Sequence, residues 1–456
     1  MGATQQMAEY MHKLSYEKLP PNVIEYCKVL ILDALGCGVR GSQTDIGEFT
    51  FEFARQLGSD PQSSIWGKRV KMASPMAAYV NASSVNALDY DDTGKGGHPG
   101  SSVIPAAIAL AERMERGGKD LILAVIAGYE VGTRIAQAIE PTWERYQQVH
   151  GIGTAQTFGS MAASAMLLDL ELEQTLNAFG IAGAIAPVAH AGKFGWYDKS
   201  ISFIKDNVAW PAEAGVRACL LAKLGYLGSE SFLDGEKGYW VMAGSDRCDF
   251  DLMTDFREFE ILTVSLKPYP CCRWIHTTLD AIDALQAKAE IKPEEIDWVD
   301  VYSILPLAEF FGKTELKSFV DMEFSVPCSI ALKLYRVPLP DWFLPRNWKN
   351  PKILDLARKV HVKLEDKYQE IFVSRNRNSV LIPSRIEVVL KGGRKLEGYE
   401  DVASGSPLRP MSPEGRLGKF RDLTAMTLSK ESQEEVIKLV TNLEKVERID
   451  EITRLL

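Results

Sequence analysis

The hydrophobic positions of the first 265 residues recur mainly with the period of an α-helix. Between Asn22 and Leu35 the apolar side chains fall on one helical face, after the Pro20-Pro21 pair that signals a helix start. The same spacing, with many Ala and other small residues, predicts helices over 105–116, 120–139, 156–168, 173–184 and 211–224. Alternation typical of strands is scarce, so this half of the chain is predicted to be helical.

The pattern changes after Leu262, where β-branched and aromatic residues begin to alternate with polar ones. This alternation predicts strands over 298–305, 360–364, 385–390 and 395–399, the last two joined as a hairpin by Gly392-Gly393. Helical spacing returns over 325–334, over 352–359 and in the charged tail after Ser412. The Pro-rich stretch 337–348 is predicted to be a loop.

These patterns predict a fold that is mainly α with an α+β part. A large all-helical domain of discontinuous sequence is expected from residues 1–265 and 406–456. A smaller α+β lid domain with an antiparallel sheet is expected from residues 266–405.

The composition is that of a soluble globular protein, with 46% hydrophobic and 25% charged residues among 456. The net charge of −9 argues against a nucleic-acid binder or a membrane-surface protein. The longest apolar stretch, 121–131, is too short to cross a bilayer. Seven cysteines at irregular spacing indicate reduced thiols rather than disulfides or a zinc site. Because no signal peptide precedes the first helix, we expect a cytoplasmic protein.

Chemically active side chains gather in the Gly-rich stretch 86–102, which contains Asp89, Asp91, Asp92, Thr93, Lys95 and His98. The stretch leads into the apolar helix predicted from Pro105, and such a loop presents polar groups to an anion at a helix N-terminus. A solvated loop with an Asp N-cap explains the same residues. The Asp pair also suits magnesium, but no phosphate-binding motif accompanies it, so we predict no metal and no cofactor.

A second candidate segment begins at the expected domain junction and contains Lys267, Tyr269, Cys272, Arg273 and His276. Clefts between domains are favoured ligand sites, although a rigid, Pro-punctuated linker is an alternative interpretation. Two isolated residues, Lys205 before a predicted helix and His150 beside Gly151, are ambiguous in the same way. The remaining histidines, at positions 12, 190 and 361, are interpreted as structural.

At these residues the sequence resembles the MmgE/PrpD family, which contains 2-methylcitrate dehydratase, cis-aconitate decarboxylase and iminodisuccinate epimerase. The resemblance covers nearly the whole chain and consists of short motifs in a fixed order. Its pieces are Leu19-Pro20-Pro21, Lys28, Asp33, Gly41-Ser42, the Asp89 to Gly100 loop, Thr157-Phe158-Gly159, Gly215 to Gly225, Lys267 to His276, Phe324 to Ala331, Gly405 to Pro413 and Lys419-Phe420.

The resemblance implies a homodimer with a cofactor-free site between a helical domain and an α+β lid. By position, Asp89, Thr93, His98 and Lys267 match active-site residues of the family. Lys205 falls at or next to a further active-site lysine. Two positions depart from the family pattern: Gly153 stands where decarboxylases or dehydratases commonly have histidine, and Cys272 stands where some decarboxylases have histidine.

The chemistry that the resemblance implies is proton removal next to a carboxylate, which requires nearby donors or cations to stabilise the developing negative charge. His98 is the first candidate for general acid or base, Asp89 for holding its tautomer and Thr93 for placing substrate or water. The candidate carboxylate clamps are Lys95, Lys205, Lys267 and Arg273. The other polar residues of the segment from Lys267 to His276 are candidates for substrate binding.

We therefore predict a hydro-lyase of the 2-methylcitrate dehydratase type, acting on a small di- or tricarboxylic acid, with catalytic His98, Asp89, Lys205 and Lys267. An epimerase of the iminodisuccinate type and a decarboxylase of the cis-aconitate type remain alternatives. So does an inactive homologue that serves as a binding or scaffold protein. The substrate-binding set is predicted to be Thr93, Lys95, His150, Tyr269, Cys272, Arg273 and His276.

Overall fold

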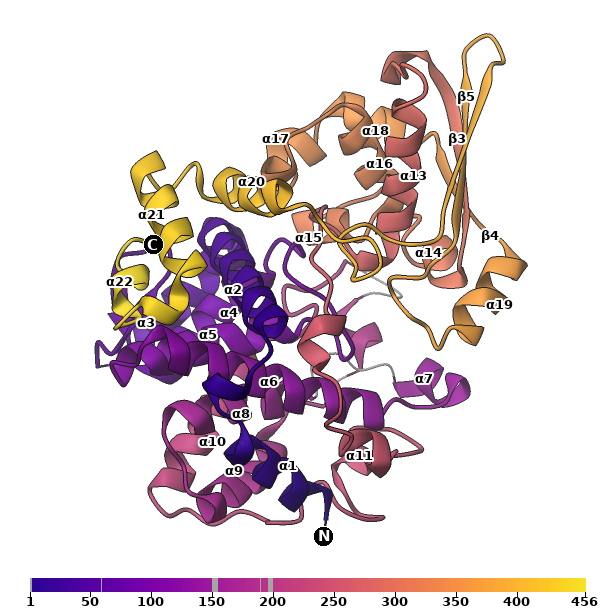
Figure 1. The fold of residues 1–456 in the computed structure, drawn as a ribbon. Helices are drawn as coiled ribbons and strands as arrows, with labels where there is room; N and C mark the ends of the chain where they lie inside the picture. The colour runs from indigo at the N-terminus through magenta and orange to yellow at the C-terminus, as the bar shows by residue number, and fades with distance from the viewer. Residues whose placement is uncertain (1, 59, 150–154, 189, 196–199) are drawn as a thin grey trace.

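A computed structural model describes residues 2–58, 60–149, 155–188, 190–195 and 200–456. The larger part of the chain forms a body of packed helices, drawn in indigo to magenta in Figure 1. Its longer helices are α1 (Ala3–Lys13), α2 (Pro21–Gly41), α3 (Asp45–Leu57), α4 (Ser74–Asn86), α5 (Pro99–Arg113), α6 (Gly118–Ala138), α7 (Trp143–Val149), α8 (Gln156–Leu167), α9 (Leu172–Ile185) and α10 (Ala209–Lys223). The prediction of a mainly helical fold with an α+β part is confirmed.

Each helix predicted in the first half is present, with one informative shift. The helix expected from Pro105 begins at Pro99, and Pro105 lies inside it. The proline at the first position suits a helix start, and Pro105 is tolerated because complete burial of the surrounding residues offsets its missing N–H. The structure also contains a short hairpin, β1 (Ser63–Ile65) and β2 (Val70–Met72), which the sequence pattern did not reveal.

Helix α6 passes through the centre of the body. By length and composition it resembles a membrane span, yet 83% of its most apolar window is buried inside the protein. It packs closely on α8, where Gly128 and Gly132 face Gly159 and leave no room for larger side chains. Close contact between small residues explains why these segments are rich in Gly and Ala.

The α+β part contains a four-stranded sheet in the order β4-β3-β5-β6. Its strands are β3 (Ile296–Ser303), β4 (Val360–Leu364), β5 (Ser384–Leu390) and β6 (Lys395–Glu400). The predicted hairpin is present, and β3 pairs antiparallel with β5, but β4 runs parallel to β3. The sheet is therefore mixed, with both parallel and antiparallel pairs, and not purely antiparallel as predicted. The parallel pair is possible because a long helical crossover connects β3 to β4.

Helices connect and cover the strands of this part. They are α13 (His276–Gln286), α14 (Leu305–Glu309), α15 (Phe319–Glu323), α16 (Val326–Leu334), α17 (Pro345–Trp348), α18 (Pro351–Ala357) and α19 (Asp366–Ser374). Helix α13 packs on β5 and β6, and α16 contacts β4. The stretch predicted to be a Pro-rich loop contains α17 and a 3₁₀ turn at Leu339–Asp341, since proline is well suited to the first turn of a helix.

The end of the chain returns to the helical body. Helices α20 (Pro413–Thr424) and α21 (Lys430–Thr441) pack against α2, and α22 (Asp450–Thr453) follows (Figure 1). We propose that residues 1–265 and 406–456 form one helical domain and that residues 266–405 form the second, called the lid domain below. This return brings Lys419 beneath the segments that carry the candidate site residues.

Candidate active site

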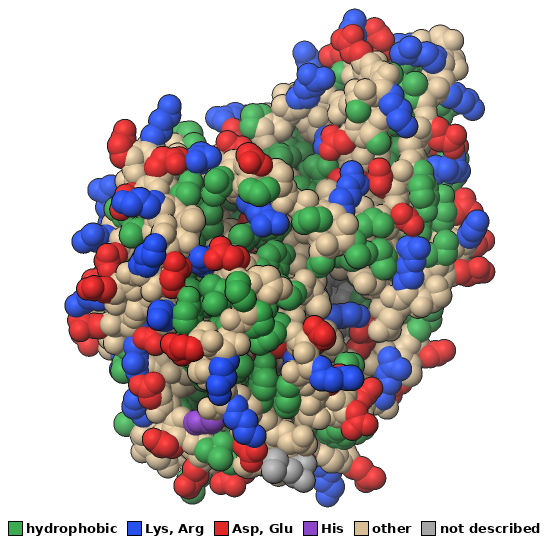
Figure 2. Space-filling view, in the orientation of Figure 1, with side chains coloured by type: hydrophobic (Ala, Val, Ile, Leu, Met, Phe, Trp, Pro, Cys, Tyr) green, Lys and Arg blue, Asp and Glu red, His purple; other side chains and the backbone are tan. Residues whose placement is uncertain are grey.

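A cavity of about 780 Å³ lies where the body and the lid domain meet. The body contributes Thr93, His98 and Asp206 to its lining, and the lid domain contributes Cys272 and Arg273. The space-filling view shows the surface hollowed between the two parts, with charged side chains around the opening (Figure 2). The cavity volume is in the range of small-molecule sites, and its position between domains is a favoured one.

The loop between α4 and α5 is held in shape by its own polar groups. Asp89 has a φ of +47°, an uncommon conformation for a residue other than glycine, and it turns the chain directly after α4. Asp92 accepts hydrogen bonds from the Gly100 amide at 3.0 Å and from the Tyr129 hydroxyl at 2.6 Å. Thr93 pairs through its backbone with Ser265, so the loop is tied to the segment that leads to Lys267.

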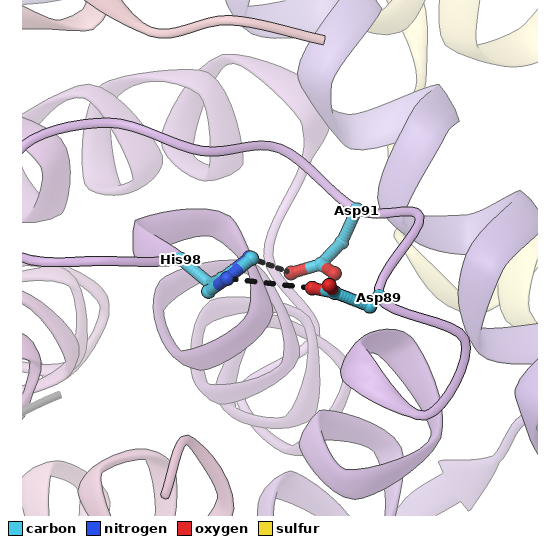
Figure 3. Close-up of side chains that lie close together, drawn as sticks. All are labelled: Asp89, Asp91 and His98. Carbon is cyan, nitrogen blue, oxygen red and sulfur yellow. Dashed lines mark ion pairs between the residues drawn. The ribbon is translucent and has the colours of Figure 1, made fainter. Parts of the chain in front are cut away.

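His98 is the buried centre of a group of carboxylates (Figure 3). Its Nδ1 lies 3.0 Å from Asp91 Oδ2, and its Nε2 lies 3.5 Å from Asp206 Oδ2 and 3.6 Å from Asp89 Oδ1. Burial disfavours the charged ring, but the nearby carboxylates, Asp91 above all, outweigh burial and raise the pKa of His98 to about 9. At neutral pH the ring is therefore an imidazolium, which has a proton to donate.

Lys267 is fully buried and holds the Asp89 carboxylate. Its Nζ donates to Asp89 Oδ1 at 2.5 Å and to the Asp89 backbone oxygen at 2.9 Å. Burial alone would raise the pKa of Asp89, but Lys267 and Lys205 reverse the effect and hold it below its usual range. The pair lies on two segments 178 residues apart, so it also joins the domain junction to the body.

Lys205, Asp206 and Glu323 form a second buried group next to His98. Lys205 Nζ lies 3.2 Å from Glu323 Oε2, 3.7 Å from Asp206 Oδ2 and 3.8 Å from Asp89 Oδ1. Among the described residues, Lys205 Nζ, Asp206 Oδ2 and both Glu323 carboxyl oxygens are buried without a hydrogen-bond partner. Unsatisfied buried polar atoms are costly, and beside a cavity they mark positions where a polar ligand fits. Lys205 also has a φ of +27°, a strained conformation of the kind found at functional sites.

A metal ion would find three possible ligands here, since donor atoms of Asp89, Asp91 and His98 all lie within 4.8 Å of one another. Metal ligands must be deprotonated, however, and the pKa of His98 is raised to about 9. The Lys267 ammonium already neutralises Asp89. The residues therefore fit a balanced cluster of charged side chains better than a metal site.

The structure separates the remaining candidates into two groups. Thr93, Lys95, Cys272 and Arg273 line the cavity. Lys95 lies near the opening, where its Nζ forms an ion pair with Glu140 at 2.8 Å, so it is not a free carboxylate clamp. Arg273 donates to the backbone oxygen of Ser404 at 2.7 Å, and burial lowers its pKa to about 10.

Tyr269 and His276 are not among the described residues that line the cavity. The Tyr269 hydroxyl donates to Asp280 and Asp283 inside the lid domain, at 2.8 and 2.6 Å. His276 lies 3.2 Å from the backbone oxygen of Cys271, and burial lowers its pKa well below the usual value. Both side chains therefore have polar partners inside the lid domain, and their roles in substrate binding stay predictions. His150 and Gly153 lie outside the described residues.

Three functional candidates were missed from the sequence. Asp206 lies beside Lys205, and this adjacency was its only signal. Glu323 directly precedes the Phe324-Ser325 motif, but nothing in its surroundings indicated complete burial. Arg377 lines the cavity and donates to Glu140 at 2.7 Å, and no motif surrounds it.

Comparison with known proteins gives a consistent result over the whole chain. The sequence profile of the MmgE/PrpD N-terminal domain matches residues 5–250, and that of the MmgE/PrpD C-terminal domain matches residues 269–445. Cis-aconitate decarboxylase of Homo sapiens is 26% identical over 99% of this chain and 94% of its own length. Cis-aconitate decarboxylase of Aspergillus terreus is 24% identical over 100% of this chain and 96% of its own length. The chain therefore belongs to the MmgE/PrpD family.

Proposed function

We propose that the protein is a cofactor-independent lyase that acts on a small di- or tricarboxylic acid by proton transfer next to a carboxylate. The observation that carries this proposal is the position of His98 beside one cavity, with its Nε2 3.5 Å from an Asp206 oxygen that accepts no hydrogen bond from the described residues. The carboxylates that raise the pKa of His98 to about 9 make it the acid of the pair. Family membership and the full-length similarity to enzymes named for cis-aconitate, a tricarboxylate, support the substrate class.

The first reaction that this arrangement suits is the removal of water, as in 2-methylcitrate dehydratase. Asp206 would take the proton from the carbon next to a carboxylate, and the electron pair left behind would form the new double bond. His98 would give its proton to the leaving hydroxyl group, which departs as water. Lys205 and Lys267, both buried next to the His98 cluster, would supply the positive charge that stabilises the enolate-like transition state.

Decarboxylation is a second candidate, and the comparisons favour it because the relatives named above are cis-aconitate decarboxylases. In that reaction the carboxylate leaves as carbon dioxide and His98 would protonate the carbon that receives the electron pair. This route needs the acid but no base. The role of Asp206 therefore distinguishes the two reactions.

The test is incubation of the protein in deuterated water with 2-methylcitrate, citrate, cis-aconitate and iminodisuccinate, followed by NMR. Loss of water supports the hydro-lyase, release of carbon dioxide the decarboxylase, and inversion with deuterium uptake an epimerase. Absence of any reaction or exchange would refute the enzyme proposal and favour an inactive binding homologue. The matched variants are H98A, expected to be inactive, and H361A, expected to be active because His361 is exposed on β4.

We also propose that the protein forms a homodimer through an aromatic face, made of Phe49, Phe53, Phe203 and Trp210. These side chains are between 37% and 62% exposed, and Phe49 stacks on Phe203 with ring centroids 5.9 Å apart. Large exposed apolar surfaces usually mark an interaction site. A cytoplasmic location is part of the same proposal, supported by seven cysteines that are all free thiols.

A further inference from the structure

Glu323 is the last residue of α15, on the lid-domain side of the site. Its side chain is 1% exposed, and its backbone oxygen accepts a hydrogen bond from the Cys272 amide at 2.8 Å. Cys272 and Phe324, which flank it, line the cavity. Glu323 therefore lies directly behind the cavity wall, in a position set by backbone contacts.

The carboxyl group of Glu323 has no hydrogen-bond partner among the described residues, although both of its oxygens are buried. Among the described residues its ion-pair partner is Lys205, whose Nζ lies 3.2 Å from Oε2 and is itself without a hydrogen bond. A buried carboxylate normally accepts several hydrogen bonds, because burial without them is very costly. Lys205 Nζ and the two Glu323 oxygens are therefore free to hydrogen-bond to a polar group that binds next to this pair.

The charges around Glu323 favour its uncharged form. Lys205, Lys267 and His98 are three buried cations, and they are already matched by the three carboxylates Asp89, Asp91 and Asp206. A further carboxylate would add negative charge to this buried cluster before an anionic substrate enters. Burial, reinforced by Asp89, raises the pKa of Glu323 well above its usual value despite the attraction of Lys205.

We propose that Glu323 is an uncharged carboxylic acid that donates a hydrogen bond to the substrate carboxylate bound by Lys205. Glu323 Oε2 lies 3.2 Å from Lys205 Nζ. A substrate carboxylate oxygen that accepts a hydrogen bond from the same nitrogen is therefore close enough to accept a second one from the Glu323 carboxyl group. A carboxylic acid kept neutral in this way is an effective donor to negative charge in a dry site. Glu323 is then a specificity residue of the lid domain, selecting substrates with a carboxylate at this place. The role rests on the proposed function, since it requires a polycarboxylate ligand.

Infrared difference spectroscopy tests the protonation state without any need for turnover. At neutral pH the wild-type spectrum minus that of E323Q is expected to show the carbonyl stretch of a protonated carboxyl group. The matched control is E309Q, which alters an exposed glutamate on α14 and is expected to show no such band. Absence of the band from the E323Q difference overturns the proposal. If E323Q does not fold, the same difference spectrum is recorded against E323L.

Adding propane-1,2,3-tricarboxylate, which has no hydroxyl group to lose, tests whether Glu323 donates a hydrogen bond to a bound carboxylate. The band is expected to shift when the tricarboxylate binds. The variant E323L, which lacks a donor, is expected to bind the tricarboxylate roughly tenfold to hundredfold more weakly, whereas E323Q keeps most of the affinity. Binding without a shift of the band overturns the role of Glu323 alone. Failure of the tricarboxylate to bind to wild-type protein overturns the proposed function together with this role.

Discussion

The protonation of His98 depends on Asp91, and replacing Asp91 with asparagine tests this dependence. The carboxylate lies 3.0 Å from Nδ1, and the Asn86 amide holds it there with a hydrogen bond at 3.2 Å. Asparagine keeps the size and one hydrogen-bond acceptor but removes the charge. We expect D91N to fold normally and to lower the pKa of His98.

The magnitude follows from the distance. Opposite charges 3.0 Å apart attract by about 5 kcal/mol at an effective dielectric constant of about 20. Asp89 and Asp206 still lie next to the ring, and an amide oxygen still accepts a hydrogen bond from it, so the net loss is smaller. A fall of about 1–3 pKa units is expected, which corresponds to roughly 1.4–4 kcal/mol. His98, with a pKa of about 9 in the folded protein, would then titrate closer to neutrality.

The assay is NMR titration of the ring carbons after selective labelling of histidine. The chain contains only six histidines, and H98Q identifies the signal of His98. In the wild type the ring is expected to be charged at pH 7.5 and to lose its proton near pH 9, and D91N lowers that midpoint. His276 is expected to remain neutral down to acidic pH. A His98 that is neutral at pH 7.5 in the wild type, or a midpoint that D91N leaves unchanged, would refute the reasoning.

When rates are measured across pH, activity is expected to fall at high pH as His98 loses its proton. In D91N the pH midpoint of this fall is expected to be lower by the same number of pH units as the pKa of His98. K419M is expected to lower the free energy of unfolding in denaturant by about 3–5 kcal/mol, because the Asp33 carboxylate, 8% exposed and 2.7 Å from Nζ, loses its partner. Adding D33N removes the unpaired charge, so the double variant K419M/D33N is expected to be more stable than K419M. A double variant that is no more stable than K419M would contradict this explanation. R377Q is expected to raise KM severalfold and leave kcat unchanged, since Arg377 lines the cavity. A kcat that changes as much as KM would contradict this expectation. F49E is expected to convert the dimer into monomers in light-scattering measurements, and a wild type that is already monomeric would refute the proposed interface.

Periodicity was sufficient to predict most of the fold, because burial of one face leaves a regular mark on the sequence. Helix α6 and strand β5 were predicted within two residues of their ends. The hairpin β1–β2 escaped because strands of three residues are too short to show alternation. The parallel pairing of β4 escaped because strand direction depends on the long connection between strands and not on their residues.

The candidate site was predictable where reactive residues are clustered along the chain. The stretch from Asp89 to His98 and the position of Lys267 are examples. Glu323 could not be predicted, since its chemistry comes from burial against Lys205, more than a hundred residues earlier in the chain. Tyr269 was assigned to substrate binding because of its neighbours in sequence, whereas its hydroxyl is engaged by acidic residues of α13. Sequence distance does not show which way a side chain points.

The central claim is that Asp206 takes a proton from the carbon next to a substrate carboxylate while His98 gives its proton to the leaving hydroxyl group. The most direct test is the rate at which deuterium from the solvent enters the polycarboxylate that reacts, measured by NMR for wild-type protein, D206N and H361A. We predict that D206N slows the uptake by about 10²–10⁴-fold without weakening substrate binding, while H361A behaves as wild type. Uptake by D206N at the wild-type rate would contradict the account.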